Sequence, residues 1–325
     1  MHKQSFAECH SLATKAPLTR PSMHFSSKIP EVSKKNSWSF QLKPQEFKQK
    51  NPGISIVNPW GLFSYNPDYT INSCATSRCF FGQFNMESEL MQDQNIRKAV
   101  EMGIDKDGFC SVIMEGRGVP AKAAFPSSFS YGNDAVETVS YDPEGAKKLL
   151  EESGWTDTDG DGYVDKDGEK LSINWLTYPT RLEQPKLAEY AQATLKDIGI
   201  DVVVNNTSDH MTIAKNGDFD VYVSSTTTAP TGDPEYFFTS TVTGAKNYGN
   251  YQNEEVTKLT DQLHQTFDKD ERAKLAVELQ QDILDDDAFF FVSHLNMGIV
   301  TKSNVTGMAA HPCDYYEITA DLDVE

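Results

Sequence analysis

Residues 171–204, LSINWLTYPTRLEQPKLAEYAQATLKDIGIDVVV, decide the fold class. Apolar side chains alternate along residues 171–178, as they do in a strand with one buried face. Residues 182–198 carry apolar side chains at helical spacing, and Gly199 offers the left-handed conformation that ends a helix. The apolar run at residues 200–204 then predicts a second strand. The stretch therefore predicts a β-α-β unit and an α/β fold with a mixed sheet.

The segments on either side continue this pattern. Upstream, Asp142 can cap a helix whose first residue is Pro143, and Gly154 can end that helix. Residues 1–42 and the proline-broken segment 51–85 show no long periodic element, although ISIV and RCFFGQF are strand-like pieces. Further elements are expected at residues 95–102, 106–114, 219–224, 254–266, 269–284 and 288–295.

The composition is that of a folded globular protein and excludes several partner classes. The chain has 325 residues, of which 38% are hydrophobic and 24% charged, and a formal net charge of -19. Because this charge repels phosphate backbones, a nucleic-acid partner is not expected. No apolar run is long enough to span a membrane, and the amino-terminal residues show no export signal. The five cysteines match no zinc pattern and are expected to be free thiols.

The sequence lacks the usual catalytic motifs. Its seven histidines form no HExxH or comparable array, and neither a GxSxG motif nor a phosphate-cradling loop occurs. His294 lies in an apolar strand and is expected to be a satisfied core histidine, whereas His264 lies on an acidic helix and is expected to be solvated. We therefore expect a protein without enzymatic activity.

The stretch DTDGDGYVDKDG, residues 157–168, looks like a calcium-binding loop. Its aspartates fit the early positions of an EF-hand loop, but Gly168 stands where a bidentate glutamate should close the shell. A strand rather than a helix follows. We expect a connection between a helix and a strand that is a weak structural calcium candidate, and no other cofactor. The candidate ligands are Asp157, Asp159, Asp161 and Asp165.

Ligand-binding groups are expected where the predicted strands end. Arg181 lies between the strand at 171–178 and the next helix, where a guanidinium beside free backbone N–H groups suits a carboxylate. An ion pair with Glu183 explains this arginine equally well. The polar loop at residues 226–234 follows another strand and offers hydroxyl and backbone donors, which either ligand binding or loop structure explains.

Longer motifs follow one another in a fixed order. They are YDPEGAKKLLEESGW (residues 141–155), the stretch from residue 157 to residue 204, FDVYVSSTTTAPTGDPEYFF (219–238), ERAKLAVELQQDILDD (271–286) and FFFVSHLNMGIVTKSNVTGM (289–308). Together they closely resemble the family 5 solute-binding proteins of ABC importers, a family that takes up peptides, nickel and metal-chelator complexes. The resemblance covers about residues 80–325.

The resemblance implies a periplasmic-binding-protein-like fold (class II, two-lobed) that closes on a ligand and delivers it to the permease subunits of an ABC importer. It also implies an extracytoplasmic, monomeric protein of the cell envelope. Family members are considerably longer, so the first lobe is expected to be incomplete and the chain to be aggregation-prone. The implied parts are an unmatched segment 1–42, a partial first-lobe or hinge segment 43–92, a ligand-binding lobe 93–285, and the return strand with the carboxyl-terminal part of the first lobe, 286–325.

Within the family the resemblance favours the nickel and metallophore branch. Pro230 stands where similar peptide binders carry an acidic residue for the amino terminus of the peptide. Arg181 resembles an arginine that clamps ligand carboxylates in metal-chelate binders. The loop at residues 243–251 has no histidine for direct nickel ligation, so a preformed chelate is the expected ligand. The candidate ligand-binding residues are Tyr178, Arg181, Thr228, Asn247 and Tyr248.

Three alternatives stay open at this point. A di- or oligopeptide-binding protein of an ABC importer differs from the chelate binder only in its ligand. A calcium-stabilised structural domain would depend on the acidic loop instead. A truncated gene product without function is the third alternative, because the resemblance covers only about the carboxyl-terminal half of the family's length.

Overall fold

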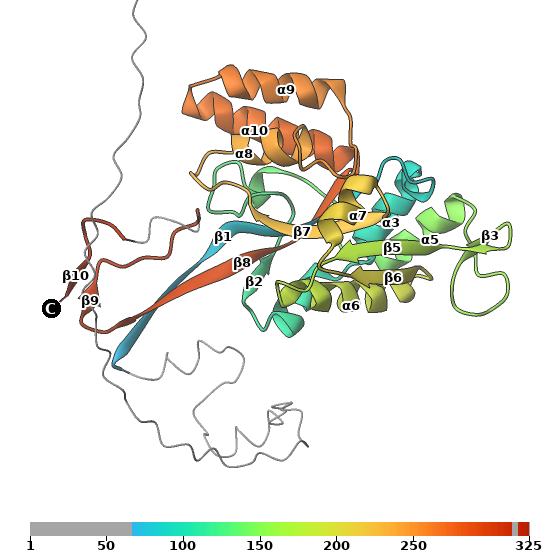
Figure 1. The fold of residues 1–325 in the computed structure, drawn as a ribbon, viewed down its shortest axis with the longest axis horizontal. Coiled ribbons are helices and arrows are strands. Elements are labelled where there is room, and N and C mark those ends of the chain that lie inside the picture. Colours follow the sequence, from blue (N-terminus) through green and yellow to red (C-terminus); the bar gives the residue numbers. More distant parts are fainter. Residues whose placement is uncertain (1–66, 314–317, 325) are drawn as a thin grey trace, which may run out of the picture. The chain divides into compact units, whose positions relative to one another are not determined.

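The computed structural model describes residues 67–313 and 318–324, which belong to one compact unit, Pro44–Glu325. A sheet of six strands in the order β2-β8-β1-β7-β5-β6 forms its centre (Figure 1). The strands of this sheet are β1 (Tyr69–Phe84), β2 (Gly118–Pro120), β5 (Ser172–Thr177), β6 (Asp201–Asn206), β7 (Val221–Thr227) and β8 (Phe289–Lys302). Parallel and antiparallel pairs both occur, which confirms the predicted α/β class with a mixed sheet.

Helices cover the sheet and form a separate layer beside it (Figure 1). The α-helices are α3 (Gln94–Gly103), α4 (Lys106–Gly108), α5 (Pro143–Glu152), α6 (Glu183–Lys196), α7 (His210–Asn216), α8 (Glu235–Phe237), α9 (Glu254–Gln265) and α10 (Lys269–Asp285). Short π- and 3-10-helical turns are η1 (Leu90–Gln92), η2 (Phe109–Ile113), η3 (Asn133–Ala135) and η4 (Phe238–Val242). Two small hairpins complete the described part, β3 (Asp165–Lys166) with β4 (Glu169–Lys170) and β9 (Val305–Thr306) with β10 (Asp323–Val324).

The predicted β-α-β unit is present. β5 pairs with β6 in parallel, and α6 connects the two strands. β7 lies on the other side of β5 and is also parallel to it, with Trp175 opposite Val221. The chain therefore runs from β5 through α6 to β6, and then returns through α7 to β7. The sequence did not predict α7, because its seven residues are too few to show a helical period.

The two connecting helices lie on opposite faces of the sheet. Leu187 of α6 shares a core cluster with Trp175 of β5. Ala214 of α7 shares a different cluster with Leu176 and Tyr222. Because Trp175 and Leu176 are consecutive strand residues, their side chains point to opposite faces. The loops after β5 and β6 consequently leave the sheet in opposite directions.

Two of the strands are longer than the sequence predicted. The predicted strand-like piece at residues 78–84 is the second half of β1, which begins at Tyr69. β8 likewise continues past Leu295, where its apolar run ends, to Lys302. The two extensions pair with each other as an antiparallel ribbon beyond the sheet (Figure 1). Because the side chains of this ribbon are mostly half-exposed, its sequence lacks the apolar pattern of a core strand.

The predicted helices are confirmed at α3, α5, α9 and α10. The Asp142 side chain caps α5 by accepting a hydrogen bond from the Gly145 N–H at 2.9 Å, and Gly154 has a φ of +84° as predicted. The single helix expected at residues 106–114 is instead α4 followed by the π-helical turn η2. Phe109 is fully buried in η2, so tertiary packing sets the wider turn.

A second core cluster lies beneath α9 and α10 and is rich in phenylalanine. Phe81, Phe289 and Phe291 from β1 and β8 belong to it, together with Phe237 of α8. Their rings contact one another, for example Phe81 and Phe237 edge to face with centroids 5.6 Å apart. No helix in residues 67–313 or 318–324 is long and apolar enough to cross a membrane. The predicted domain boundaries stay predictions, and the ISIV piece lies outside the described residues.

Candidate ligand-binding site

The loops after the carboxyl ends of β5 and β6 diverge to opposite faces at the edge of the sheet. The loop after β5 leads to α6 on one face, whereas the loop after β6 leads to α7 on the other face. In open α/β sheets such a divergence of neighbouring loops leaves a crevice in which ligands bind. Tyr178 and Arg181 lie in the first loop, and His210 begins the helix after the second. This crevice is the candidate ligand-binding site.

Four aromatic rings meet beside this crevice. The rings of Tyr178 and His210 stack with centroids 4.3 Å apart, and the Tyr222 ring lies 5.9 Å from that of His210. The Tyr248 ring contacts Tyr222 edge to face at 5.6 Å. We call these residues, Tyr178, His210, Tyr222 and Tyr248, the aromatic cluster. It brings two of the predicted ligand-binding residues together from different parts of the chain.

Hydrogen bonds hold the aromatic cluster against β7. The backbone N–H of Ser225 donates to the hydroxyl of Tyr178 at 3.2 Å. Nδ1 of His210 lies 2.8 Å from the hydroxyl of Tyr222. Burial raises the pKa of Tyr222, which keeps its phenol protonated. The buried hydroxyl of Ser225 has no partner within the described residues, so this side of the crevice retains a polar group without an internal hydrogen bond.

Arg181 is half-buried at the start of α6. Its backbone carbonyl accepts a hydrogen bond from the Gln184 N–H at 3.1 Å, which fixes the turn into the helix. Among residues 67–313 and 318–324, its guanidinium makes neither an ion pair nor a hydrogen bond, and the alternative of a pair with Glu183 is not observed. The guanidinium therefore remains available to an external anion.

Thr228 and Asn247 have structural partners. Thr228 is fully buried, and its hydroxyl lies 2.9 Å from the Ser77 carbonyl and 2.7 Å from the Ala124 carbonyl. The Asn247 amide donates to the Tyr251 carbonyl at 2.8 Å and accepts from the Tyr251 N–H at 3.1 Å, so it closes a turn. Asn247 also lines a groove of about 880 Å³ that runs along α9. A ligand-binding role for these two residues stays a prediction.

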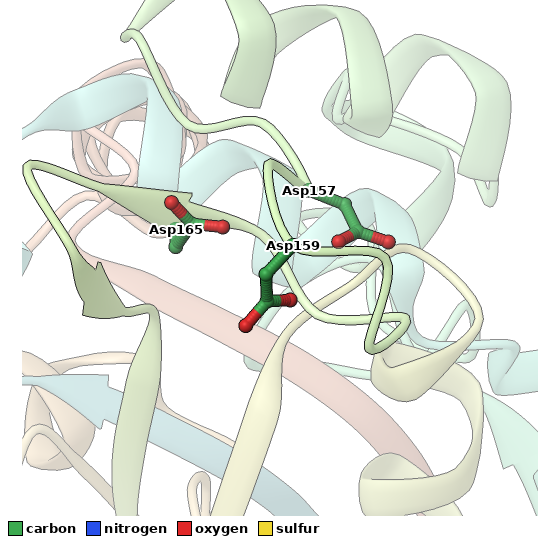
Figure 2. A group of neighbouring side chains, drawn as sticks. All are labelled: Asp157, Asp159 and Asp165. Carbon is green, nitrogen blue, oxygen red and sulfur yellow. The ribbon is translucent and has the colours of Figure 1, made fainter.

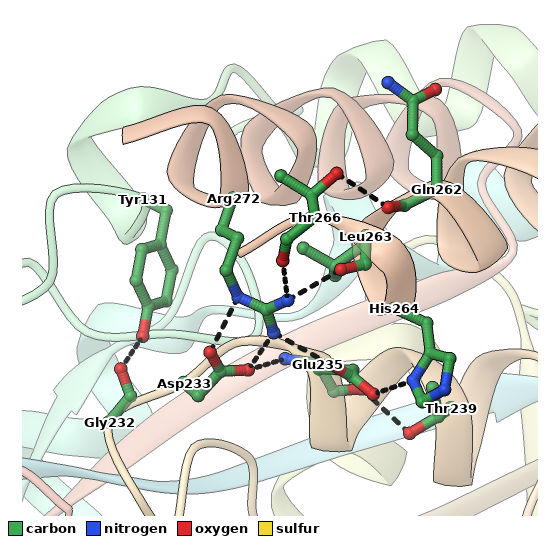
Figure 3. Close-up of polar contacts among 10 residues, drawn as sticks. All are labelled: Tyr131, Gly232, Asp233, Glu235, Thr239, Gln262, Leu263, His264, Thr266 and Arg272. Carbon is green, nitrogen blue, oxygen red and sulfur yellow. Dashed lines mark hydrogen bonds and ion pairs between the residues drawn. The ribbon is translucent and has the colours of Figure 1, made fainter. Parts of the chain in front are cut away.

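Arg272 of α10 holds the polar loop after β7 by contacts with its side chains (Figure 3). The guanidinium donates to both carboxylate oxygens of Asp233, at 2.6 and 2.9 Å, and to Glu235 at 2.8 Å. It also donates to the Leu263 and Thr266 carbonyls, both at 2.6 Å. The loop at residues 226–234 is thereby fixed to the turn between α9 and α10.

His264 joins the same network. Its side chain is 70% exposed, so it is solvated as expected. In addition, its Nδ1 lies 2.6 Å from Glu235, which the Arg272 guanidinium also contacts. The sequence did not reveal this contact because Glu235 is far from His264 along the chain.

The acidic loop brings three of its four candidate ligands together (Figure 2). Carboxylate oxygens of Asp157, Asp159 and Asp165 lie within 4.8 Å of one another. Asp161 points elsewhere and pairs with Lys170 at 2.7 Å. Backbone N–H groups of the loop also donate to Asp157, for example from Gly160 at 2.7 Å. The acidic stretch follows α5 and runs into β3, whose first residue is Asp165, which confirms that it connects a helix to a strand.

His294 and most of the described cysteines are buried. His294 is fully buried, and burial lowers its pKa to about 3. Its Nε2 lies 3.3 Å from the Asn133 side chain, while its buried Nδ1 has no partner in the described residues, so this core histidine is only partly satisfied. Within the described residues, Cys79, Cys110 and Cys313 are free thiols.

Sequence reasoning missed His210 and Tyr222. A lone histidine at the start of a seven-residue helix carries no periodic signal, and Tyr222 is an ordinary strand residue by its pattern. The crossing of α7 over the sheet brings both of them to Tyr178. His210 can be identified as a site residue only once the strand order is known, because that order shows which loops lie beside each other after β5 and β6.

Known proteins resemble this chain in sequence. A family profile described as bacterial extracellular solute-binding proteins, family 5 Middle, matches residues 39–249. Oligopeptide-binding protein AppA of Bacillus subtilis is 29% identical over 256 residues, which cover 76% of this chain and 47% of that protein. The nickel-binding periplasmic protein of Escherichia coli is 24% identical over 271 residues, which cover 81% of this chain and 51% of that protein. The chain thus spans about half the length of these curated relatives.

Solved structures share the fold. The crystal structure of a nickel ABC transporter from Bacillus halodurans has a TM-score of 0.70 and 29% identity, with 81% of this chain and 55% of that chain covered. NikA from Staphylococcus aureus in complex with Ni(L-His)2 has a TM-score of 0.66 and 24% identity, with 83% and 56% covered. The matched profile spans well over half of the sequence. The chain therefore belongs to the bacterial extracellular solute-binding proteins of family 5.

Proposed function

We propose that the chain binds a nickel chelate, or a similar metal chelate with carboxylate groups, as part of the solute-binding component of an ABC importer. The observation that carries this proposal is Arg181, a half-buried guanidinium at the carboxyl end of β5 without an internal anion in the described residues. A guanidinium of this kind is well suited to hold a carboxylate through two parallel hydrogen bonds.

The charge of the protein makes this arginine distinctive. With a formal net charge of -19, the chain repels small anions in general. An anionic ligand therefore needs a local cation, and Arg181 supplies one in the loop that also carries Tyr178 of the aromatic cluster. The rings of that cluster offer apolar surface to the carbon framework of a chelator. The protein would thus bind the organic chelator, while the chelator supplies most of the ligands of the metal.

The crevice is an exposed edge of one lobe rather than a closed cavity. A two-lobed binding protein closes on its ligand, so one lobe alone presents only half of the site. The grooves along α9 and beside Arg272, of about 880 and 820 Å³, lie elsewhere in the fold. We favour the crevice over these grooves because Arg181 and the ends of two parallel strands converge there.

A short peptide is the second candidate ligand. It is favoured by the relation to AppA, whose name describes an oligopeptide-binding protein and which is 29% identical. Against it stands Pro230, because the amino terminus of a peptide calls for a carboxylate and a proline has none. Delivery to permease subunits outside the cytoplasm, as a monomer and without covalent chemistry, is proposed for either ligand.

Titration calorimetry with Ni(II)–nitrilotriacetate tests the proposal. We expect saturable binding, and a dissociation constant that rises roughly ten- to one-hundred-fold in Arg181→Ala, because charge-assisted hydrogen bonds contribute about 1.5–3 kcal/mol. Arg117→Ala is the matched control, since it removes a half-buried arginine beside β2 whose guanidinium donates to the Met114 carbonyl at 3.0 Å. Equal affinity of Arg181→Ala and the unaltered chain would contradict the proposal, as would binding of tripeptides but not of the chelate.

A further inference from the structure

His210 is held in one orientation by two neighbours. Its ring stacks on Tyr178 with an interplanar angle of 26°, which fixes the plane of the imidazole. Its Nδ1 lies 2.8 Å from the hydroxyl of Tyr222, which fixes the rotation of the ring within that plane. The direction of Nε2, the other ring nitrogen, is therefore set by the fold.

Nε2 of His210 is available from outside. In residues 67–313 and 318–324 no hydrogen bond or ion pair involves this atom. It is also absent from the buried polar atoms that lack a partner, so it reaches solvent. The ring that carries it is stacked on Tyr178, which lies at the carboxyl end of β5 in the same loop as Arg181.

The surroundings of His210 favour the neutral imidazole. Burial lowers the pKa of His210, and the nearby carboxylate of Asp209 offsets this only in part. The other titratable groups that face the ring are the phenols of Tyr178 and Tyr222. Burial raises the pKa of Tyr222, so that group stays uncharged. A neutral imidazole carries a lone pair on one of its two nitrogens.

The hydrogen bonds around His210 accommodate the tautomer with the lone pair on Nε2. In this tautomer the Nδ1–H donates to the oxygen of Tyr222. The hydroxyl hydrogen of Tyr222 then turns to the sulfur of Met211, which lies 3.9 Å away. Metal-binding histidines in proteins usually donate their second N–H to a fixed oxygen in this way, which orients the ring and fixes the tautomer.

We propose that Nε2 of His210 occupies an open coordination position on the metal of the bound chelate. This inference rests on the proposed function, because it assumes that a chelate lies in the crevice. Imidazole nitrogen is a suitable ligand for nickel, copper and zinc. The loop at residues 243–251 has no histidine, and His210 supplies from α7 the imidazole that this loop lacks. The site would then select chelates whose metal is not fully coordinated by the chelator.

Two probe chelates separate this inference from the proposed function. Nitrilotriacetate leaves coordination positions open on Ni(II), whereas ethylenediaminetetraacetate can occupy all of them, and both present carboxylates. We expect the unaltered chain to bind the nitrilotriacetate chelate more tightly, by about tenfold or more. In His210→Asn, which keeps a polar atom near Tyr222 but has no counterpart of Nε2, the preference should vanish. Arg181→Ala should weaken both chelates.

A spectroscopic readout identifies the ligand directly. Electron paramagnetic resonance of the Cu(II)–nitrilotriacetate complex should show coupling to an imidazole nitrogen in the unaltered chain and none in His210→Asn. Tyr222→Phe should retain the coupling but bind more weakly, because Nε2 is present and less well oriented. Circular dichroism and thermal melting check that each variant folds.

The outcomes are distinguishable. If both chelates bind, depend on Arg181 and are unaffected by His210→Asn, the histidine inference is overturned while the proposed function stands. Persistence of the nitrogen coupling in His210→Asn overturns it as well. If neither chelate binds the unaltered chain, the proposed function and the inference fail together.

Discussion

At the scale of single residues, Arg272 shows how one side chain can hold two segments together. Its side chain is only 14% exposed and contacts Asp233, Glu235 and two backbone carbonyls. These contacts join the loop after β7 to the turn between α9 and α10 (Figure 3). A partly buried, bidentate arginine contributes more to stability than an exposed ion pair, because its partners would otherwise lose hydrogen bonds inside the protein.

Replacing Arg272 should therefore destabilise the fold. We expect Arg272→Met to lower the free energy of unfolding by about 2 kcal/mol, since it removes the guanidinium that joins the partly buried carboxylates of Asp233 and Glu235. Lys274→Met on the same helix removes the same charge from a pair in which Lys274 is 75% exposed, and should cost no more than about 0.5 kcal/mol. Urea unfolding measures both. Similar losses of unfolding free energy in the two variants would show that the Arg272 contacts stabilise the fold no more than an exposed ion pair does.

His294 makes the stability of the fold depend on pH. Burial lowers its pKa to about 3, whereas an unfolded histidine titrates near pH 6.5. Between these values the unfolded chain binds a proton that the folded chain does not. The contribution is therefore fully present above about pH 6.5 and is lost as the pH falls, by roughly 1.4 kcal/mol per pH unit.

The expected measurement compares His294→Gln with the unaltered chain. Glutamine does not titrate, and its Nε2 can replace that of histidine beside Asn133. From pH 7 to pH 5 the unaltered chain should lose about 2 kcal/mol more unfolding free energy than the variant. The other titrating groups are common to both proteins and cancel. An identical pH dependence in the two proteins would mean that His294 titrates in the fold with the same pKa as in the unfolded chain.

The residues of the candidate site differ in how far the sequence revealed them. Arg181 was predicted from its position after a strand, and the structure finds its guanidinium without an internal partner in the described part. Thr228 was predicted from the same kind of position but is buried, because hydroxyl donors in a loop also satisfy backbone carbonyls. α7 carries His210, and the pairing of β7 with β5 places Tyr222 opposite Leu176. Such contacts between distant segments leave no pattern in the local sequence.

At the scale of elements, the acidic loop is a connection whose carboxylates converge. Asp157, Asp159 and Asp165 lie close together (Figure 2). Asp161 is held by Lys170 instead. Hydrogen bonding by Lys170 lowers the pKa of Asp161, so this carboxylate is already stabilised by a cation. Structural calcium binding stays a prediction, and the structure assigns Asp161 a different partner from the one that an EF-hand pattern implies.

Calcium titration of thermal stability tests this element. If the loop binds calcium, millimolar Ca²⁺ should raise the melting temperature, by the equivalent of about 1.4 kcal/mol at tenfold the dissociation constant. Asp159→Asn should abolish the rise, because it removes one of the three converging carboxylates. Asp161→Asn is the matched control and should retain it. No calcium effect on the unaltered chain, or its loss in the control as well, would contradict this assignment.

Elements were predicted well where capping and apolar periodicity coincide, and less well elsewhere. α5 has a capping aspartate, a proline at its first residue and a glycine after its end, so its bounds follow from sequence. The ribbon formed by the outer parts of β1 and β8 has half-exposed side chains and no such pattern. The split of the predicted helix into α4 and η2 follows from the burial of Phe109, which is a tertiary effect.

At the scale of the whole molecule, the α/β class and the β-α-β unit followed from residues 171–204 alone. The order of the sheet did not, because the pairing of β1 with both β7 and β8 joins distant segments. That order is what places the loops after β5 and β6 on opposite faces and so creates the crevice. Membership in family 5 agrees with this architecture, and the choice of ligand depends on the crevice residues.

The central claim is that a metal chelate lies in this crevice. Anomalous diffraction at the nickel absorption edge, from crystals of the chain grown with Ni(II)–nitrilotriacetate, locates the metal without assumptions about affinity. We predict a peak beside Arg181 and His210, at the carboxyl ends of β5 and β6. A nickel peak at the acidic loop or along α9 alone, with none in the crevice, would contradict the account.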